Sequence, residues 1–313
     1  MSMSPMPAVL LTDHDSADYR ALLQHQNNGI VVRTLEDGAA LRAECDVWLG
    51  APEGVIDQLR EGLLPRWVQL TWAGIAPMLD PTLPRGFQLT RASGVFGAPM
   101  LEYLLHHMLA HAWQSADYPA AQSRFCWRPA STGRLSGKCV VVVGLGSIGL
   151  HIARALAALG MHVKGVQRVP RQVAGIERVG SMDALLEFAS SADYVINVLP
   201  DTPATRDLYD SRFFAAMSGS GVFINIGRGS AVVDQALIDA LGQEQIAAAV
   251  LDVFRKEPLP PSHQFWVTPN LTLTPHIAGP TNTAAMIEFF LNNLSNYQAG
   301  QSLEGLVDLE QGY

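Results

Sequence analysis

This sequence has few cysteines and no long apolar run. Its three cysteines, Cys45, Cys126 and Cys139, are scattered and lack the spacing of a metal site, so we expect reduced thiols and no disulfide framework. No stretch reaches the roughly 18 uninterrupted apolar residues of a membrane span, and Met1 to Pro7 lacks the charged start and apolar core of a signal peptide. We therefore predict a cytoplasmic protein with no membrane partner.

Charge is also scarce. Charged residues make up 16% of the chain, the net charge is −8, and there is no run of lysine and arginine. This composition argues against nucleic acid and anionic membranes as partners. A small anionic substrate would need local arginines to overcome the overall negative field. With 313 residues, 48% of them hydrophobic, the chain can bury the cores of two domains.

The sequence is organised around the stretch from Cys139 to Gly160. Four consecutive valines at 140–143 have no polar face, which is typical of a strand buried on both sides in a parallel sheet. Apolar residues at helical spacing over 147–159 then predict a helix, and Gly160 is placed to end it. The stretch therefore predicts a strand, a glycine turn and a helix.

Gly144, Gly146 and Gly149 supply the three glycines of a G-x-G-x-x-G motif. They would serve a tight turn, a close approach to a pyrophosphate, and close packing of helix on strand, respectively. A diphosphate would lie on the helix N-terminus at Ser147 and Ile148, where N–H groups and the helix dipole favour anions. A second strand at 162–166 completes a βαβ unit, which favours dinucleotide binding over a purely structural glycine turn.

Strands and helices alternate through most of the chain, which predicts parallel sheets with helices on both faces. We expect further strands at 9–11, 30–32, 47–49, 67–70, 194–199, 222–226, 247–251 and 271–273. We expect further helices at 17–25, 35–43, 55–60, 98–115, 182–189, 211–217, 233–241 and 280–296, with a connector at 120–135. The fold class is therefore α/β with doubly wound parallel sheets, and the first hundred residues form a small α/β domain of their own.

Residues 71–74 directly follow an expected strand, at the carboxyl end where open α/β sheets bind ligands. Gly74 would leave backbone N–H groups accessible to an anion. The alternative is an ordinary turn from strand to loop.

His107 and His111 have the i, i+4 spacing of zinc ligands on the expected long helix. The glutamate of H-E-x-x-H is missing, so we expect packed or surface histidines and no metal.

Three polar residues follow strands of the second half: Arg228, Glu257 and His276. Because the carboxyl ends of parallel strands share one edge of a sheet, a cation, a carboxylate and an imidazole should converge there. Any one of them could be surface decoration. Together, downstream of a dinucleotide motif, they suit the reduction of a 2-keto acid.

At this point the sequence resembles the D-isomer-specific 2-hydroxyacid dehydrogenase family. The resemblance is carried, in order, by GLGSIG, LPDTPAT, INIGRGSAVVDQALIDAL, LDVFRKEPLP and PHIAG. It implies two Rossmann-like domains around a central cleft: a flavodoxin-like substrate-binding domain of residues 1–97 plus 282–313, and a dinucleotide-binding Rossmann domain of residues 98–281. It also implies a homodimer formed through the nucleotide domain, with the long helix from Ala98 and the connector at Trp127–Pro129 at the interface.

The resemblance gives the three polar residues their roles. Arg228 should hold the substrate carboxylate and polarise the keto oxygen, for which a planar guanidinium is suited. His276 should act as the general acid toward that oxygen while hydride arrives from the nicotinamide. Glu257 should fix the tautomer of His276 and favour its charged form.

The resemblance also assigns binding residues. The substrate carboxylate should meet Ala73 and Gly74, next to Trp72. Besides the glycine motif, the cofactor should contact Pro200, Thr205, Ile226, Gly227, Asp252 and Gly279. Apolar residues near the mouth of the cleft, among them Trp48, Leu49, Trp72, Met100 and Phe254, should set substrate specificity.

One departure concerns the cofactor. An NAD-specific domain carries an acidic residue after the second strand, but here the chain reads Gln167-Arg168 and continues to Arg171. We therefore predict that NADP(H) is preferred over NAD(H), with Arg168 and Arg171 on the 2′-phosphate. The alternative is that these are surface arginines without this role.

The stretches TWAGI and GVFGAPMLEY and the WRP connector look most like the glyoxylate/hydroxypyruvate reductase subgroup. The expected substrate is accordingly a small anionic 2-keto acid, reduced to the D-2-hydroxy acid. An alternative from another class is a nucleotide-sensing interaction protein resembling the corepressors that share this fold.

Overall fold

The computed structural model describes residues 7–13, 16–26, 29–127, 129 and 133–309. The chain divides into two compact units. The first unit comprises Met1–Phe96 together with Thr281–Tyr313, and the second comprises Gly97–Pro280. Each unit is built on its own parallel sheet, so the α/β fold class predicted from the sequence is confirmed.

The first unit contains a five-stranded parallel sheet in the order β2-β1-β3-β4-β5. Its strands are β1 (Ala8–Leu11), β2 (Val31–Arg33), β3 (Val47–Gly50), β4 (Trp67–Leu70) and β5 (Gln88–Thr90). This order is that of flavodoxin-like sheets, in which the direction of winding reverses between β1 and β3.

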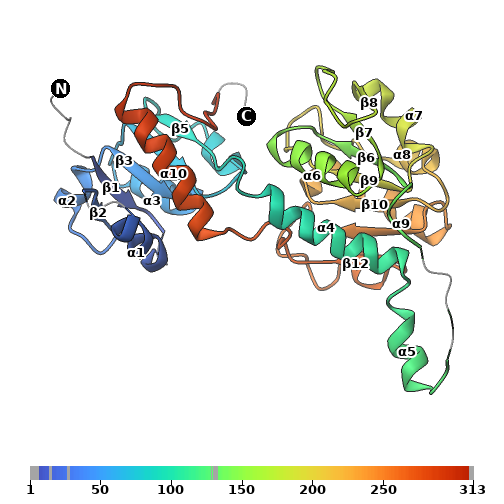
Figure 1. Ribbon diagram of the computed structural model, residues 1–313. Helices are drawn as coiled ribbons and strands as arrows, with labels where there is room; N and C mark the ends of the chain where they lie inside the picture. Colours follow the sequence, from blue (N-terminus) through green and yellow to red (C-terminus); the bar gives the residue numbers. More distant parts are fainter. Residues whose placement is uncertain (1–6, 14–15, 27–28, 128, 130–132, 310–313) are drawn as a thin grey trace. The chain divides into compact units, whose positions relative to one another are not determined.

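Helices of the first unit come from both ends of its sequence. They are α1 (Ala17–Gln26), α2 (Ala39–Ala43), α3 (Pro52–Arg60), the 3₁₀ turn η1 (Ala76–Leu79) and α10 (Thr283–Gln298). α10 packs beside α1, and Figure 1 shows it, in red, lying across this unit. The buried ring of Trp67 stacks on Phe290 and Tyr297 of α10, with ring centroids 5.5 and 5.2 Å away. These stacked rings join the two chain segments in one core.

The second unit contains a seven-stranded parallel sheet in the order β12-β11-β10-β9-β6-β7-β8. Its strands are β6 (Cys139–Val143), β7 (His162–Val166), β8 (Arg178–Gly180), β9 (Tyr194–Asn197), β10 (Val222–Asn225), β11 (Ala248–Leu251) and β12 (Leu271–Leu273). This is the Rossmann order, with its switch point between β6 and β9. A ligand would bind outside the carboxyl ends of these two strands.

The second unit has helices on both faces of its sheet and one that projects from it. They are α4 (Gly97–Ala112), α5 (Asp117–Ser123), α6 (Ser147–Ala158), α7 (Leu185–Ala189), α8 (Ser211–Ala216) and α9 (Asp234–Gly242), with 3₁₀ turns η2 (Met182–Ala184), η3 (Gly229–Ala231) and η4 (Gln264–Val267). On one face, Val141 and Val143 pack with Phe188, Phe213 and Leu237 of α7, α8 and α9. On the other face α6 packs on β6, and α4 packs on α6. Figure 1 shows α5 extending away from the body of this unit.

Several expected elements differ in extent. The helix expected at 35–43 begins only at Ala39, because 35–37 form a turn in which the Asp37 side chain accepts from the amide of Thr34 at 2.8 Å. β5 and β8, each three residues long, were not predicted. The connector expected at 120–135 includes the end of α5, a short helix with Pro119 in its first turn. The last helix begins at Thr283, where Asn282 caps it through the amide of Ala285.

Among the described residues, no helix is both long enough and apolar enough to cross a lipid bilayer.

Candidate active site

The glycine turn after β6 has the geometry that the motif requires. Gly144 has a φ of 103°, a conformation that side chains rarely adopt. At Gly149 a Cβ atom would lie 1.9 Å from the carbonyl oxygen of Gly144, so only glycine lets α6 approach the turn. At Gly146, the exposed N-cap of α6, a Cβ would meet nothing within 4 Å. The turn therefore leaves an open backbone surface beside the first amides of α6, those of Ser147 and Ile148.

Residues after β7 offer positive charge and no acid. The segment 167–171 reads QRVPR, and both of its arginines, Arg168 and Arg171, are exposed. β7 is the neighbour of β6 in the sheet, so this segment follows the carboxyl end of the strand next to the glycine turn. These residues fit a phosphate-bearing ribose better than one with free hydroxyls.

Two buried asparagines shape the loops on the other side of the switch point. Asn197 and Asn225 are paired at the ends of β9 and β10, and Nδ2 of Asn197 donates to Oδ1 of Asn225 at 2.8 Å. The hydroxyl of Tyr209 donates to Asn197 at 2.9 Å, and Asn225 donates to the carbonyl oxygen of Arg228 at 3.0 Å. This network fixes the backbone on which Arg228 is carried.

The loops after β9 and β10 lie against each other near this network. Gly227 is buried, and a Cβ there would lie 2.7 Å from the carbonyl oxygen of Leu199. Ile226 is also buried. In the loop after β9, the hydroxyl of Thr205 donates to the carbonyl oxygen of Pro200 at 2.7 Å. Pro200, Thr205, Ile226 and Gly227 thus lie in loops at the edge of the sheet that carries the glycine turn.

Two carboxylates are near enough to Arg228 for their charges to affect its pKa. Burial lowers the pKa of its guanidinium, whereas the charges of Glu257 and Asp201 raise it. Arg206 holds Asp201 in an ion pair at 3.0 Å, and hydrogen bonding from Arg206 lowers the pKa of Asp201. Since an arginine pKa begins so high, Arg228 stays charged at neutral pH and supplies a fixed positive charge.

Glu257 and His276 form a pair. Oε2 of Glu257 lies 2.8 Å from Nδ1 of His276. The amide of Phe254 donates to the other oxygen, Oε1, also at 2.8 Å, so both carboxylate oxygens are fixed. The side chain of His276 is 50% exposed, and the glutamate holds the imidazole by one nitrogen only. This arrangement suits an imidazole that exchanges a proton at Nε2.

The loop that carries Glu257 is tied down by Arg255. The guanidinium of Arg255 donates to the carbonyl oxygen of Val232 at 2.7 Å and pairs with Asp234 at 3.4 Å and with Asp207. Asp234 in turn lies 3.3 Å from Nε2 of His263, at the other end of the loop.

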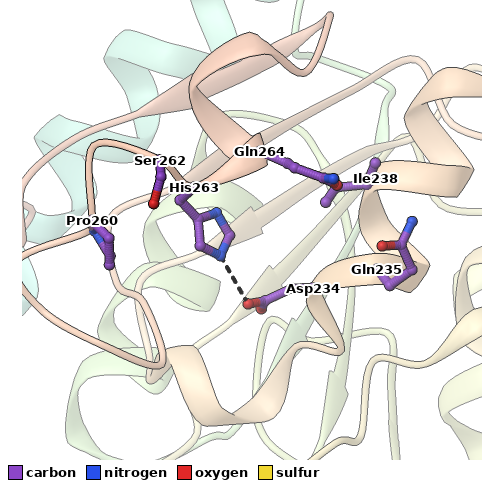
Figure 2. Close-up of a pocket in the computed structure, with 7 residues that line it drawn as sticks. All are labelled: Asp234, Gln235, Ile238, Pro260, Ser262, His263 and Gln264. Atoms are coloured by element: carbon purple, nitrogen blue, oxygen red, sulfur yellow. Dashed lines mark hydrogen bonds and ion pairs between the residues drawn. The ribbon is translucent and has the colours of Figure 1, made fainter.

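Figure 2 shows this part of the loop around a pocket in which His263 points toward Asp234 at the start of α9. The pocket lies between α9 and the segment before η4. None of the residues predicted for catalysis or cofactor binding lines it. We therefore interpret the His263–Asp234 pair as a support for the Glu257 loop.

Asp252 is buried after β11, and its carboxylate accepts from the amides of Ile277 and Ala278 at 2.8 Å each. Its carboxylate therefore holds the loop that carries His276. Gly279 follows in the same loop and is half-buried.

The predicted substrate loop lies in the first unit. Trp72 is 42% exposed directly after β4, and Ala73 and Gly74 are half-buried. Trp48 and Leu49 do not fit the specificity role expected of them, because each is only 1% exposed in the core of this unit. Met100 is likewise buried, whereas Phe254 is half-buried.

The helix-spaced histidines of α4 make ring contacts. His107 packs on Tyr103 with ring centroids 4.4 Å apart, and His111 faces Tyr194 edge-on at 6.1 Å. No group of three or more His, Cys, Asp or Glu side chains that could hold a metal ion occurs in the described part of the chain.

Sequence reasoning missed the asparagine pair and Arg255. A signal for the pair exists: YVIN and VFIN are both apolar strands that end in asparagine, and the two asparagines fall in register. For Arg255 no comparable local signal exists, because its partners lie 21 to 48 residues away in sequence.

The sequence of this chain is similar to those of known proteins. A family model described as D-isomer specific 2-hydroxyacid dehydrogenase, NAD binding domain, matches residues 105–278. The glyoxylate/hydroxypyruvate reductase A of Serratia proteamaculans is 34% identical over 233 residues, which is 74% of either chain.

Solved structures give the same result. A D-isomer specific 2-hydroxyacid dehydrogenase family protein of Aeromonas salmonicida superposes with a TM-score of 0.89 at 31% identity, covering 97% of this chain and 99% of that one. An NADPH-dependent glyoxylate/hydroxypyruvate reductase of Sinorhizobium meliloti, solved with NADP and sulfate, superposes with a TM-score of 0.84 at 28% identity, covering 98% and 100%.

The contact between the Arg228 and Glu257 loops depends on Gly229. A Cβ atom there would lie 1.9 Å from the carbonyl carbon of Phe254, the residue whose amide binds Glu257. Gly229→Ala should lower the free energy of unfolding by about 2 to 3 kcal/mol through overpacking. Thermal unfolding measures this loss, with Gly219→Ala as the control because a Cβ at Gly219 meets nothing within 4 Å. Equal melting temperatures for the two variants would contradict the prediction.

Proposed function

We propose, from the premise that this chain belongs to the D-isomer specific 2-hydroxyacid dehydrogenase family, that it reduces a small 2-keto acid to the D-2-hydroxy acid with NADPH. The observation that carries the proposal is the His276–Glu257 pair, which shares a Rossmann sheet edge with the charged guanidinium of Arg228. A proton donor and an anion-binding cation are the two groups that reduction of a keto acid requires of the protein.

His276 donates the proton in this proposal. Glu257 binds Nδ1, which leaves Nε2 to carry the proton that goes to the keto oxygen. The amide of Phe254 keeps the carboxylate from rotating, so the orientation of the ring is set before the substrate arrives. After transfer, the neutral imidazole keeps its hydrogen bond to Glu257 and takes up a proton from solvent.

Arg228 binds the substrate carboxylate and polarises the keto oxygen. Its charge is local, which lets an acidic chain attract an anion at this point. In the first unit, the amides of Ala73 and Gly74 and the exposed ring of Trp72 are the substrate contacts that this proposal assigns.

The residues that would hold the cofactor fit a dinucleotide. The Gly144–Gly149 turn and the start of α6, at Ser147 and Ile148, take the diphosphate. Pro200, Thr205, Ile226, Gly227, Asp252 and Gly279 line the nicotinamide half. When bound, the nicotinamide supplies the hydride that adds to the keto carbon.

NADPH is the preferred form. Segment 167–171 has no acid to accept from a ribose hydroxyl, and its arginines suit the 2′-phosphate. The Sinorhizobium meliloti relative, solved with NADP and described as NADPH-dependent, supports this preference, and NADH remains a weaker alternative. The names of the relatives support glyoxylate or hydroxypyruvate as the substrate class.

The proposal assigns the two units separate roles. Residues 1–97 with 282–313 bind substrate, and residues 98–281 bind the dinucleotide, for which the family match at 105–278 is support. We also propose a homodimer formed through the second unit, in a cytoplasmic protein. Phe125 and Trp127 are 99% and 97% exposed beyond the projecting α5, and a second copy of the chain would cover them. Arg128, the middle residue of the connector, lies outside the described residues.

The reaction is tested by following NADPH oxidation with glyoxylate, hydroxypyruvate, pyruvate and phenylpyruvate. The smallest acids should turn over, and His276→Ala should lower kcat by about 100- to 10,000-fold, because the acid acts in the chemical step. NADPH affinity, measured by fluorescence titration, should change less than about twofold since His276 is not needed for the ground-state complex.

The matched control for this variant is His162→Ala. His162 pairs with Glu177 as His276 pairs with Glu257, but on an exposed surface at the amino end of β7. Wild-type kcat is expected there. Tight nucleotide binding without turnover of any keto acid would contradict the proposal and favour the nucleotide-sensing alternative.

Cofactor preference is tested at Arg168. Arg168→Asp should reverse the ratio of kcat/KM for NADPH over NADH by about 100-fold or more, because a carboxylate repels the 2′-phosphate and binds ribose hydroxyls. Arg154→Asp, at an exposed position of α6, makes the same charge change and should leave the ratio unaltered. An unchanged ratio in Arg168→Asp would remove this residue from the site.

The dimer is tested by light scattering after gel filtration. Replacing Phe125 and Trp127 together by serine should shift the mass from that of two chains to that of one, because the apolar contact is lost. Val267→Ser, which alters an 83% exposed apolar residue of η4, should keep the dimer. A wild-type protein that elutes as a monomer at micromolar concentration would refute the proposed assembly.

A further inference from the structure

We propose that Tyr103, on α4, positions His276 through a chain of hydrogen bonds that runs by way of Thr274 and Asp252. The inference deepens the proposed function, because its consequence for turnover rests on the role of His276 as the proton donor. Tyr103 itself is a positioning residue, and it acts only through the loop that carries the imidazole.

The backbone of His276 needs support. Its φ is 56°, in the left-handed region that residues other than glycine adopt only at a cost. Asp252 accepts most of the hydrogen bonds that hold this conformation: the amides of His276, Ile277 and Ala278 all donate to it, each at 2.8 Å, and the amide of His276 also lies 3.1 Å from the carbonyl oxygen of Thr274. The first bond goes to the main-chain oxygen of Asp252 and the other two go to its carboxylate. The direction of the imidazole therefore depends on where this buried carboxylate lies.

Thr274 fixes that carboxylate. Its hydroxyl lies 2.6 Å from Oδ1 of Asp252, to which it donates, because an ionised carboxylate only accepts. The single proton of the Thr274 hydroxyl is thereby used. Its remaining contact, 2.6 Å from the hydroxyl of Tyr103, must then be one in which Tyr103 donates.

Tyr103 is suited to be the first donor in this series of hydrogen bonds. Burial raises the pKa of its phenol to about 12, so the phenol keeps its proton at working pH and remains a donor. The ring of His107, one turn further along α4, lies 4.4 Å from the ring of Tyr103 and restricts it. The hydrogen bonds therefore connect α4 to the loop that carries His276: Tyr103 bonds to Thr274, Thr274 to Asp252, and Asp252 to the loop.

Tyr103→Phe removes only the hydroxyl at the start of this chain. We expect kcat to fall about tenfold, because a small displacement of a catalytic group costs turnover. The KM for the keto acid and for NADPH should change less than about twofold, since neither binding site loses a group. Hydrogen–deuterium exchange of a peptide covering 275–280 should become faster, because the carboxylate that holds its amides is less constrained.

The matched control is Tyr194→Phe. Tyr194, on β9, is buried, and its hydroxyl donates to the carbonyl oxygen of Met108 in α4 at 3.3 Å. This variant likewise loses one tyrosine hydrogen bond between α4 and another part of the second unit, but away from Thr274, and should show wild-type kcat and wild-type exchange at 275–280. A merely structural role for Tyr103 predicts equal effects in both variants and would overturn the inference.

Thr274 provides an independent check on the route. Thr274→Val breaks both hydrogen bonds and should lower kcat at least as far as Tyr103→Phe does, whereas Thr274→Ser keeps the hydroxyl and should retain most activity. In a variant that already carries Thr274→Val, adding Tyr103→Phe should lower kcat little further, because Thr274→Val has already removed the hydrogen bond to Tyr103. Full additivity of the two changes would show that Tyr103 does not act through Thr274.

Failure of the proposed function can be told apart from failure of this inference. If wild-type protein reduces no keto acid, the reaction is wrong, and the exchange of 275–280 still reports whether Tyr103 holds the loop. If wild-type protein turns over while Tyr103→Phe matches it in kcat and in exchange, the reaction stands and the positioning role is wrong.

Discussion

Parallel alignment of the seven strands is the constraint on which the candidate site depends. Because every strand of this sheet runs in one direction, each loop that leaves a carboxyl end emerges at the same edge. The glycine turn, Arg228, Glu257 and His276 thus reach one edge although together they span the sequence from Gly144 to His276. The strand ends also carry polar groups, Asn197, Asn225 and Asp252, which hold the loops instead of contributing to the apolar core. Sheet and site are therefore built from the same residues.

Local charge at this edge differs from the charge of the whole chain. A net charge of −8 would repel a small carboxylate, yet Arg228 remains charged and Asp201, beside it, is neutralised by Arg206. One carboxylate oxygen of Glu257 accepts from the amide of Phe254 and the other lies against His276, so the negative charge of Glu257 is placed next to the imidazole. Short-range pairing therefore gives the site a polarity that no count of charges along the chain reveals.

The sequence predicts those parts of this protein in which the local backbone conformation allows only one type of residue. Gly144 and Gly149 are predictable because a positive φ and a 1.9 Å approach tolerate no other residue, and the long valine strand is predictable from its composition. The polar residues after the strands were found because strand ends converge. The hydrogen bond of Tyr103 to Thr274 was out of reach, since 171 residues separate them and no local pattern links the two positions. Trp48 and Leu49 were wrongly predicted to set substrate specificity, because an apolar side chain suits a buried core as well as a binding site.

Trp67 and its stacked partners on α10 have a consequence for how the polypeptide is made. The first unit begins the chain, but its tryptophan is covered by Phe290 and Tyr297, and Asn293 of the same helix donates to Gln69 in β4 at 3.0 Å. The amide of Val307 also donates to Leu89, which extends the sheet beyond β5. On the ribosome, the inserted unit Gly97–Pro280 is therefore fully synthesised, and can close, while the unit that was started first still waits for its last helix. The order of synthesis and the order of core completion are opposite, and the nascent chain must keep an unfinished apolar surface shielded in the interval.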